Sequence, residues 1–180
     1  MPRKLKRSDE LQRLNVEAFK ASEKTPVVLI LDNVRSALNV GSAFRTADAF
    51  RLASIGLCGI TAKPPHREIL KTALGASKSV DWQYFEQTTA AIRHYKQQGY
   101  KILVVEQVTA SIPLERYEVA KTDKIALIFG NEVKGVSQEA IDQADGGVEI
   151  SQFGTKRSLN ISVCVGIVVW EVFRKLNFCN

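Results

Sequence analysis

Three short segments contain the residue types that can bind a ligand or assist a reaction. They read "NVRSALNVGSAFRTAD" (33–48), "GNEVKGVS" (130–137) and "SQFGTKRSLNIS" (151–162), and they are the densest clusters of Gly, Asn and Ser in the chain. Glycine lets a backbone approach a ligand closely, and the polar side chains supply hydrogen-bonding groups. Such segments are typical of loops that place backbone groups against a bound molecule.

The first segment has two interpretations. Asn39 can cap a helix, Gly41 permits a close backbone approach near its start, and Arg45 follows among small and apolar residues. These residues either serve a site, or Asn39 is only a cap and Arg45 is structural. In the structural alternative, Arg45 extends its charge to solvent or pairs with Asp48 or Asp32. The segment alone leaves both open.

The second segment follows an apolar run and turns at Gly130, Asn131 and Glu132, before Ser137, a residue type that caps helices. A carboxylate beside free backbone groups suits the amine, the ribose hydroxyls or the adenine of a nucleoside-like ligand. The alternative is an ordinary tight turn with an exposed Glu.

The third segment leads into an apolar helix. Ser158 can cap that helix, and Lys156 can be an ordinary solvated charge of the preceding loop. Asn160 and Ser162 lie where the apolar run begins, so we expect both to be partly buried and to need hydrogen-bond partners. A helix N-terminus also offers unpaired N–H groups to a ligand.

Several familiar chemical motifs do not occur in the sequence. It contains no GxxxxGK[ST] phosphate loop, no GxGxxG dinucleotide fingerprint and no GxSxG nucleophile elbow. His66 and His94 have no carboxylate or cysteine at metal-ligand spacing, and the three cysteines are far apart. We therefore expect neither a metal site nor a disulfide framework.

Composition favours one folded domain with an anionic partner. The chain has 180 residues, of which 45% are hydrophobic, and this suits a single sizeable core. A net charge of +6 favours a polyanion such as RNA, although many basic enzymes touch no nucleic acid. No apolar run is long enough to cross a membrane, and the first residues lack the apolar core of a signal peptide. We expect a cytoplasmic protein that does not enter a membrane.

Alternating apolar runs and helical patterns predict the fold. Apolar runs typical of buried parallel strands occupy residues 26–32, 54–60, 101–106, 124–130 and, more weakly, 146–150. Helical patterns occupy roughly residues 40–51, 66–73, 88–98, 137–144 and 159–176. The alternation predicts an α/β fold with a mostly parallel sheet. The three polar segments each follow a strand, where open parallel sheets bind their ligands.

The N-terminal region is predicted to differ from the rest of the chain. Residues 8–23 show the pattern of an amphipathic helix, with apolar residues spaced among charges. This helix follows the basic start "MPRKLKR". We expect residues 1–24 to form a basic helical extension and residues 25–180 to form the single domain.

Together and in this order, the three segments resemble the motifs of a known family. "NVGSAFRTADAF" (39–50), "IALIFGNEVKGVS" (125–137) and "SLNISVCVGIVVWE" (158–171) are similar to motifs 1, 2 and 3 of the SpoU (TrmH-like) RNA 2′-O-ribose methyltransferases, in the SPOUT superfamily. The resemblance extends from about residue 26 to about residue 176. It implies a mostly parallel α/β sheet flanked by helices, with a deep C-terminal trefoil knot. General topology rules would not have suggested the knot.

The resemblance also implies the cofactor, the assembly and the site residues. The cofactor would be S-adenosylmethionine, and the protein would be a homodimer whose active sites draw on both chains. The cofactor-binding residues would be Gly130, Asn131, Ile150, Leu159, Ser158 and Asn160, the last also bracing the knot. The catalytic residues would be Arg45, Asn39, Glu132 and Ser158. Ser151 departs from the family pattern, because the family usually has Pro there, and the following loop is then less rigid.

The implied substrate is the ribose 2′-hydroxyl of tRNA or rRNA. The candidate RNA contacts are Arg3, Lys4, Lys6, Arg7, Lys156 and Arg157. Two other functions stay open: a knotted enzyme that methylates a base nitrogen, and a non-catalytic RNA-binding protein that retains the knot. The Asn-x-Gly…Arg pattern of motif 1 favours the ribose.

Arg45 has two conceivable roles in this reaction. A guanidinium has a pKa above about 12 and stays protonated, so we favour a stabiliser of the developing alkoxide that also clamps the adjacent phosphate. The alternative is a general base assisted by that phosphate. We expect Asn39 to orient Arg45 or the ribose, and Glu132 to contact the cofactor or Arg45.

Overall fold

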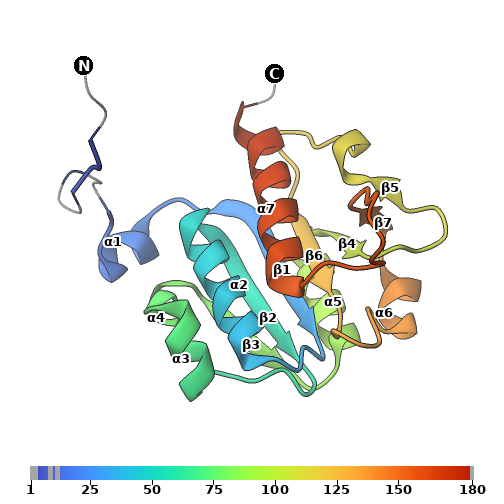
Figure 1. The fold of residues 1–180 in the computed structure, drawn as a ribbon, viewed down its shortest axis with the longest axis horizontal. Helices are drawn as coiled ribbons and strands as arrows, with labels where there is room; N and C mark the ends of the chain where they lie inside the picture. Colours follow the sequence, from blue (N-terminus) through green and yellow to red (C-terminus); the bar gives the residue numbers. More distant parts are fainter. Residues whose placement is uncertain (1–3, 8–9, 11–12, 179–180) are drawn as a thin grey trace.

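The computed structural model describes residues 4–7, 10 and 13–178 of the chain, and within them seven strands form one parallel sheet (Figure 1). The strands are β1 (Thr25–Asp32), β2 (Leu52–Cys58), β3 (Trp82–Phe85), β4 (Lys101–Val105), β5 (Ile112–Pro113), β6 (Ile125–Phe129) and β7 (Gly146–Glu149). Their order across the sheet is β3-β2-β1-β6-β4-β7-β5, and every neighbouring pair is parallel.

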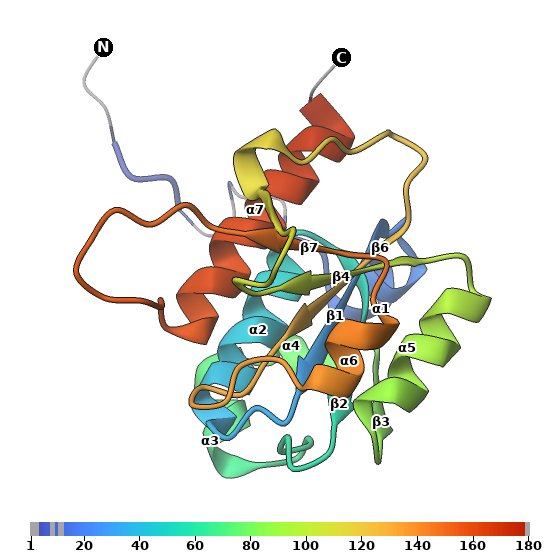
Figure 2. The ribbon, with the colours of Figure 1, turned by 90° about the vertical axis from the view of Figure 1, so that its right-hand side faces the viewer.

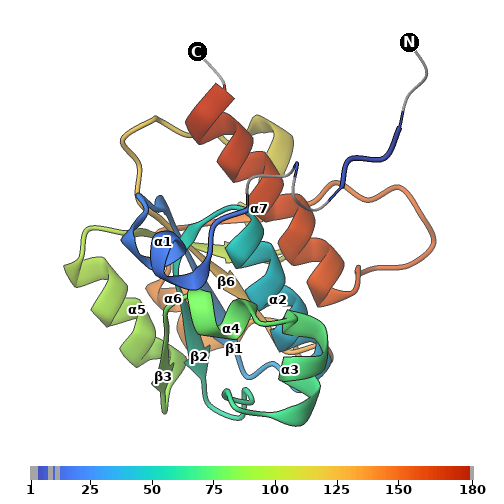
Figure 3. The ribbon, with the colours of Figure 1, turned by 90° about the vertical axis from the view of Figure 1, so that its left-hand side faces the viewer.

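Helices cover both faces of this sheet (Figures 1, 2 and 3). Those of one face are α1 (Val16–Ala21), α2 (Ala37–Ala49), α3 (Arg67–Ala73), α4 (Ala76–Ser79) and α7 (Ile161–Phe178). Those of the other face are α5 (Thr88–Gln97) and α6 (Gln138–Gln143). A 3₁₀ helix, η2 (Leu114–Arg116), lies beside the C-terminal half of α7. The α/β fold with a parallel sheet is therefore confirmed.

Burial on both faces explains why the strands are apolar throughout. Along β1, Leu29 and Leu31 pack into the core beneath α2 and α7, whereas Val28 and Ile30 pack into the core beneath α5 and α6. Successive side chains of a strand point to opposite faces, so a strand covered on both sides needs apolar residues at every position.

The five predicted strands and the five predicted helices of the main domain are all present, with ends shifted by up to three residues. The prediction missed β3, β5 and α4, which have only four, two and four residues. Such short elements show too little periodicity to be recognised, and β3 and β5 lie at the two edges of the sheet.

Of the predicted helix over 8–23, the described residues form an α-helix only from Val16 to Ala21. Its described part begins only at Val16, because Asn15 is the N-cap and accepts a hydrogen bond from the backbone N–H of Ala18 at 2.8 Å. Residues 8–9 and 11–12 of the prediction lie outside the described residues. Phe19 of the short helix is buried in the core beneath α2.

Gly41 sets the distance between α2 and α3. A Cβ atom at this position would lie 2.1 Å from Thr72 Oγ1 and 2.5 Å from the carbonyl oxygen of Ile69, so only glycine fits. The predicted close backbone approach is thus a helix–helix contact. It holds α2, which carries the first polar segment, against its neighbour.

The carboxyl ends of the strands and the segment after β7 form one edge of the molecule. Residues 150–160 leave β7, make a wide arc away from the sheet and return to the start of α7 (Figure 2). None of the helices in the described part of the chain is both long and apolar enough to cross a membrane.

Candidate active site

A cavity of about 570 Å³ opens at the carboxyl ends of β4, β6 and β7. Of the residues predicted to form a site, it is lined by Gly130, Asn131, Glu132, Ile150, Arg157, Ser158, Leu159 and Asn160. The second and third polar segments therefore meet in space, as expected for loops at the same edge of a parallel sheet. Asn39, Arg45 and Lys156 do not line the cavity, and neither do Lys4, Lys6 or Arg7. Arg3 lies outside the described residues.

The turn after β6 needs glycine at its first position. Asn131 and Gly135 exchange two backbone hydrogen bonds of 2.9 Å, which close the turn tightly. A Cβ atom on Gly130 would lie 2.1 Å from the carbonyl carbon of Gly135 and 2.2 Å from the backbone nitrogen of Val136. Glycine thus allows two backbone segments to touch at the wall of the cavity.

The side chain of Asn131 holds this turn and the loop after β1 together. Its amide nitrogen donates to the carbonyl oxygen of Asn33 at 2.8 Å, and its amide oxygen accepts from the backbone N–H groups of Val133 (2.9 Å) and Lys134 (3.0 Å). With both ends of the amide engaged, the side chain of Asn131 fixes the shape of the cavity wall.

Glu132 binds the N-terminus of α2. Its carboxylate accepts hydrogen bonds from the backbone N–H groups of Arg35 (2.9 Å) and Ser36 (3.0 Å) and from Nδ2 of Asn39 (3.0 Å). Burial would raise the pKa of this carboxyl group, but the hydrogen bonds from Arg35, Asn39 and Ser36 outweigh it and lower the pKa. A carboxylate at this place also interacts favourably with the helix dipole.

Two expectations for this region are corrected by these contacts. Ser36, and not Asn39, is the N-cap of α2, because its hydroxyl accepts from the N–H of Asn39 at 3.3 Å. Asn39 is the third residue of the helix, in its first turn, and its amide nitrogen reaches Glu132. Glu132 contacts Asn39, and no contact with Arg45 occurs among the described residues, whereas the alternative contact with the cofactor stays a prediction.

Arg45 lies exposed on α2, away from the cavity of its own chain. No described residue forms a hydrogen bond or an ion pair with its guanidinium. Asp48 instead accepts from Ser79 Oγ at 2.5 Å, and the buried Asp32 accepts from Thr88 Oγ1 at 2.6 Å and from the N–H of Ser137 at 2.8 Å. The structural alternative in which Arg45 pairs with Asp48 or Asp32 is therefore wrong.

The N-terminus of α7 is capped by Asn160 and not by Ser158. The helix begins at Ile161, and Asn160 Oδ1 accepts from the backbone N–H of Ser162 (2.8 Å) and from its hydroxyl (2.6 Å). Asn160 is exposed and Ser162 is half-buried, so the expected burial holds only for Ser162. The family resemblance implies that Asn160 braces the knot, but its side chain is occupied in capping α7. Ser158 and Leu159 do not cap the helix and line the cavity.

The prediction missed Glu106 and Gln107, which follow β4 and line the same cavity, and also Glu149 and Gln152. Gln107 Nε2 donates to the carbonyl oxygen of Arg157 at 3.1 Å, which connects the β4 end to the third segment. These residues could have been found from their position, because ligands bind where parallel strands end. Glu106 was missed because the predicted strand over 101–106 included it.

The residues of the cavity fit S-adenosylmethionine. This molecule carries a sulfonium, an ammonium and a carboxylate group, and the acidic residues Glu106, Glu132 and Glu149 are among those that line the cavity. Its adenine and methionine chain need apolar surface, which Ile150 and Leu159 supply. The volume lies within the roughly 300–1,000 Å³ of small-molecule sites. In the described part of the chain, no three His, Cys, Asp or Glu side chains gather in a way that could hold a metal ion.

Comparison with known proteins points to one family. Residues 26–170 match the model of the SpoU rRNA Methylase family. The chain is 27% identical to the 23S rRNA (guanosine-2′-O-)-methyltransferase RlmB of Vibrio vulnificus, over 96% of this chain and 68% of that protein. It is 29% identical to the tRNA (guanosine(18)-2′-O)-methyltransferase of Borreliella burgdorferi, over 83% of this chain and 67% of that protein.

Solved structures share the fold. The AdoMet-bound rRNA methyltransferase of Sinorhizobium meliloti superposes with a TM-score of 0.77 at 27% identity, and the match covers 84% of this chain and 57% of that one. The chain thus spans about two thirds of the length of the curated relatives and little more than half of this structural neighbour.

Proposed function

Because the chain belongs to the SpoU rRNA Methylase family, we propose that it transfers the methyl group of S-adenosylmethionine to a ribose 2′-hydroxyl of tRNA or rRNA. The observation that carries this proposal is the cavity at the carboxyl ends of β4, β6 and β7. It is lined by both the second and the third polar segment, whose motifs resemble those of the family, and acidic residues line it, which suits a cofactor with a net positive charge.

In this proposal, the backbone at Gly130, Ile150 and Leu159 holds the cofactor. Asn131 and Asn160 act indirectly, because their side chains fix the two loops that carry those backbone groups. The bound cofactor supplies an electrophilic methyl group on a sulfonium that leaves as a neutral thioether. Ser158 lies on the cavity wall, where its hydroxyl can position the cofactor or the incoming ribose.

Arg45 stabilises the charge that develops on the ribose oxygen. Its guanidinium keeps its proton, so it acts by electrostatic stabilisation and by hydrogen bonds to the adjacent phosphate. The absence of a hydrogen-bond or ion-pair partner among the described residues leaves the group available for this role. Asn39 and Glu132 position it indirectly, because their contact fixes the start of α2, which carries Arg45 further along.

The working enzyme is a homodimer in this proposal. Arg45 does not line the cavity of its own chain, so a second copy is needed to bring this residue to the cofactor. A dimer face is available on α7, where Val163, Ile167 and Trp170 are exposed along one side of the helix, next to Leu159 at the cavity. Apolar side chains in such a row are costly to leave in water.

The remaining expectations belong to the same proposal. The segment over 150–160 and α7 form the trefoil knot together with the turn after β6, which shares the cavity wall with that segment. The basic residues Arg3, Lys4, Lys6, Arg7, Lys156 and Arg157 attract RNA through its phosphates. The protein works in the cytoplasm, where tRNA and rRNA are found.

Isothermal titration with S-adenosylmethionine and S-adenosylhomocysteine tests cofactor binding, and a map of ribose methylation across total RNA, with and without the protein, tests the reaction. We expect both ligands to bind and the methylation of at least one ribose position to depend on the protein.

An Arg45→Ala variant should bind both ligands but leave that position unmethylated. Arg51→Ala, which removes another exposed arginine just beyond α2, should be fully active. Absence of heat with both ligands would reject the proposal in favour of a non-catalytic RNA-binding protein, and a methylated base nitrogen would reject the ribose as target.

A further inference from the structure

Phe153 belongs to the arc that residues 150–160 make between β7 and α7, which Figure 2 shows. Its side chain is 97% exposed, and its ring stacks on no aromatic ring and receives no cation among the described residues. An aromatic side chain in water gains nothing for the fold of the single chain, since burial of its apolar surface is what stabilises a protein. Only a partner outside the single chain described here could bury this ring.

The arc is anchored at both ends and free between them. Ser151 Oγ donates to Glu115 Oε1 at 2.8 Å at one end, and the carbonyl oxygen of Arg157 accepts from Gln107 Nε2 at 3.1 Å at the other. Residues 152–156 form no hydrogen bond with any described residue. A Cβ atom on Gly154 would meet nothing within 4 Å. Phe153 is thus exposed on a stretch of chain that is fixed on both sides.

Charge and position indicate the partner. Lys156 and Arg157 follow Phe153 in the same arc and are exposed without an ion pair to a described residue, and residues 150–160 contain no Asp or Glu. An exposed aromatic ring beside cations is the arrangement that binds single-stranded nucleic acid, through base stacking and phosphate contacts. Gln152 and Arg157, which precede and follow Phe153 in the arc, both line the cavity, so the stretch that carries the ring begins and ends at the cavity wall.

We propose that Phe153 stacks on an unpaired base of the RNA substrate next to the nucleotide that enters the cavity. Lys156 and Arg157 would bind the flanking phosphates. A nucleotide that leaves the base stack can place its ribose hydroxyl deep in a cavity of this kind, and the neighbouring base then loses a stacking partner that Phe153 replaces. This inference rests on the proposed function, and it selects loops or single strands of RNA over continuous duplex.

Three variants separate stacking from other roles of the side chain: Phe153→Ala, Phe153→Leu and Phe153→Tyr. Their affinities are measured by fluorescence anisotropy with a short single-stranded RNA, with the same strand in a duplex, and with an abasic strand of the same backbone. We expect the Kd for the single strand to rise about ten-fold in the Ala and Leu variants and to stay within about two-fold of wild type in the Tyr variant. The duplex and the abasic strand should bind all four proteins equally.

Two results would overturn the inference. If the Leu variant binds the single strand as tightly as wild type, a hydrophobic contact suffices and stacking is wrong. If sedimentation velocity shows that the Ala variant has lost a subunit contact, Phe153 belongs to an interface between two copies of the chain. Titration of the same four proteins with S-adenosylmethionine distinguishes failure of this inference from failure of the proposed function. If the wild-type protein binds RNA through Phe153 but does not bind the cofactor, only the methyltransferase function is disproved.

Discussion

Glu132 illustrates how a single carboxylate joins two polar segments of the sequence. It belongs to the turn after β6, yet its three hydrogen bonds all go to residues at the start of α2. The helix that carries Arg45 therefore starts at a point set by the loop that lines the cavity. A displacement of that loop is expected to move Arg45 as well.

Replacement of Glu132 with Gln tests this connection. The amide keeps the shape but loses the negative charge and turns one acceptor into a donor that faces N–H groups. We expect the free energy of unfolding at neutral pH to fall by about 1–3 kcal/mol and the methylation rate to fall with it.

The effect should depend on pH. Because the pKa of Glu132 is lowered in the folded protein, its contribution to the free energy of unfolding is present above the ordinary carboxyl pKa and is lost as the pH falls below it. Urea unfolding should therefore show a smaller difference between variant and wild type in acid than at pH 7, and an equal difference at both would contradict this account.

Arg45→Lys tests what the guanidinium contributes. Lysine keeps the positive charge but lacks the planar pair of donors that can bind a phosphate and an alkoxide together. We expect kcat to fall by about ten-fold or more, with an unchanged Kd for S-adenosylmethionine, in a single-turnover methylation assay. Arg51→Lys serves as the matched control. Nearly full activity of Arg45→Lys would mean that positive charge alone is sufficient.

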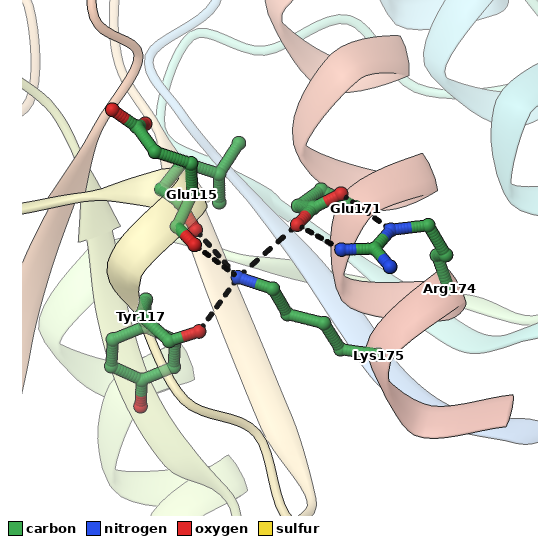
Figure 4. A network of polar contacts seen from close by, with 6 residues as sticks. Glu115, Tyr117, Glu171, Arg174 and Lys175 are labelled. Carbon is green, nitrogen blue, oxygen red and sulfur yellow. Dashed lines mark hydrogen bonds and ion pairs between the residues drawn. The ribbon is translucent and has the colours of Figure 1, made fainter. Parts of the chain in front are cut away.

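At the scale of elements, the C-terminal half of α7 is tied to η2 by one lysine (Figure 4). Lys175 Nζ donates to the carbonyl oxygens of Leu114 (2.8 Å), Glu115 (3.3 Å) and Tyr117 (2.7 Å), and it forms a 3.2 Å ion pair with Glu171. Its side chain is only 12% exposed. Lys175 therefore supplies the donors that the carbonyl groups at the end of a 3₁₀ helix need.

This connection extends to the cavity. Glu115 of η2 accepts from the hydroxyl of Ser151, the residue that stands where the family usually has Pro. A hydrogen bond between side chains thus holds the start of the arc over 150–160, where a proline ring would restrict the backbone directly. α7, η2 and the arc behave as one connected unit beside the cavity.

We expect Lys175→Met to destabilise the protein by about 2 kcal/mol, because methionine fills the space but supplies no donor to the carbonyl oxygens of Glu115 and Tyr117. The carbonyl oxygen of Leu114 keeps only the N–H of Tyr117, at 3.3 Å. Chemical denaturation followed by circular dichroism measures the change. Lys20→Met, which removes an exposed lysine from α1, should have almost no effect. An equally small effect of Lys175→Met would show that water replaces the ammonium group without cost.

Glu171 makes the same region sensitive to acid. The hydrogen bonds from Arg174 lower the pKa of Glu171 to about 2, and the ion pair with Lys175 adds to this against the opposing effect of burial. A lowered folded pKa means that the stabilisation is complete above the ordinary pKa of 4.5 and is lost as the pH falls from there towards 2. The unfolding free energy of Glu171→Gln should consequently decline less than that of wild type over this range. Parallel curves from urea titrations at several pH values would contradict the assignment.

At the scale of the whole molecule, the exposed apolar face of α7 is the feature that bears on the proposed dimer. The first two thirds of this helix are largely apolar in sequence, and the structure buries only the side towards α2 and the sheet, including Val165, Val168 and Val172. The side with Val163 and Ile167 stays in water in the single chain. Full burial of the helix would therefore require a second molecule.

Introduction of charge on that face tests the dimer. We expect Val163→Glu combined with Ile167→Glu to sediment as a monomer and to lose RNA methylation, while titration still detects binding of S-adenosylmethionine in the cavity of the single chain. Leu74→Glu, at the exposed end of α3, controls for charge on a different apolar residue. An active monomer would mean that Arg45 reaches the cofactor within its own chain.

Local patterns were sufficient to predict the order of elements, the parallel sheet and the family. Buried strands covered on both faces must be apolar at every position, so β1 and β6 are recognisable from a few residues. The same rule placed the second and third polar segments at one edge of the sheet, where the cavity is found. The family followed from the residue types and order of the motifs, and it is confirmed. The division at residue 24 and the chemical roles of the site residues stay predictions.

Partners distant in the chain depended on the tertiary structure alone. Ser158 and Asn160 are both good caps, and only the path of the segment decides that Asn160 caps α7 and Ser158 lies on the cavity wall. The three hydrogen bonds of Glu132 cross more than ninety residues, and no local periodicity records such a pairing. Propensity and periodicity act over a few neighbouring residues, whereas the direction of a polar side chain depends on whichever unpaired group the fold brings near it. For that reason the sequence revealed which segments form the site, and the fold decided which of their side chains build the wall and which are left to face the ligand.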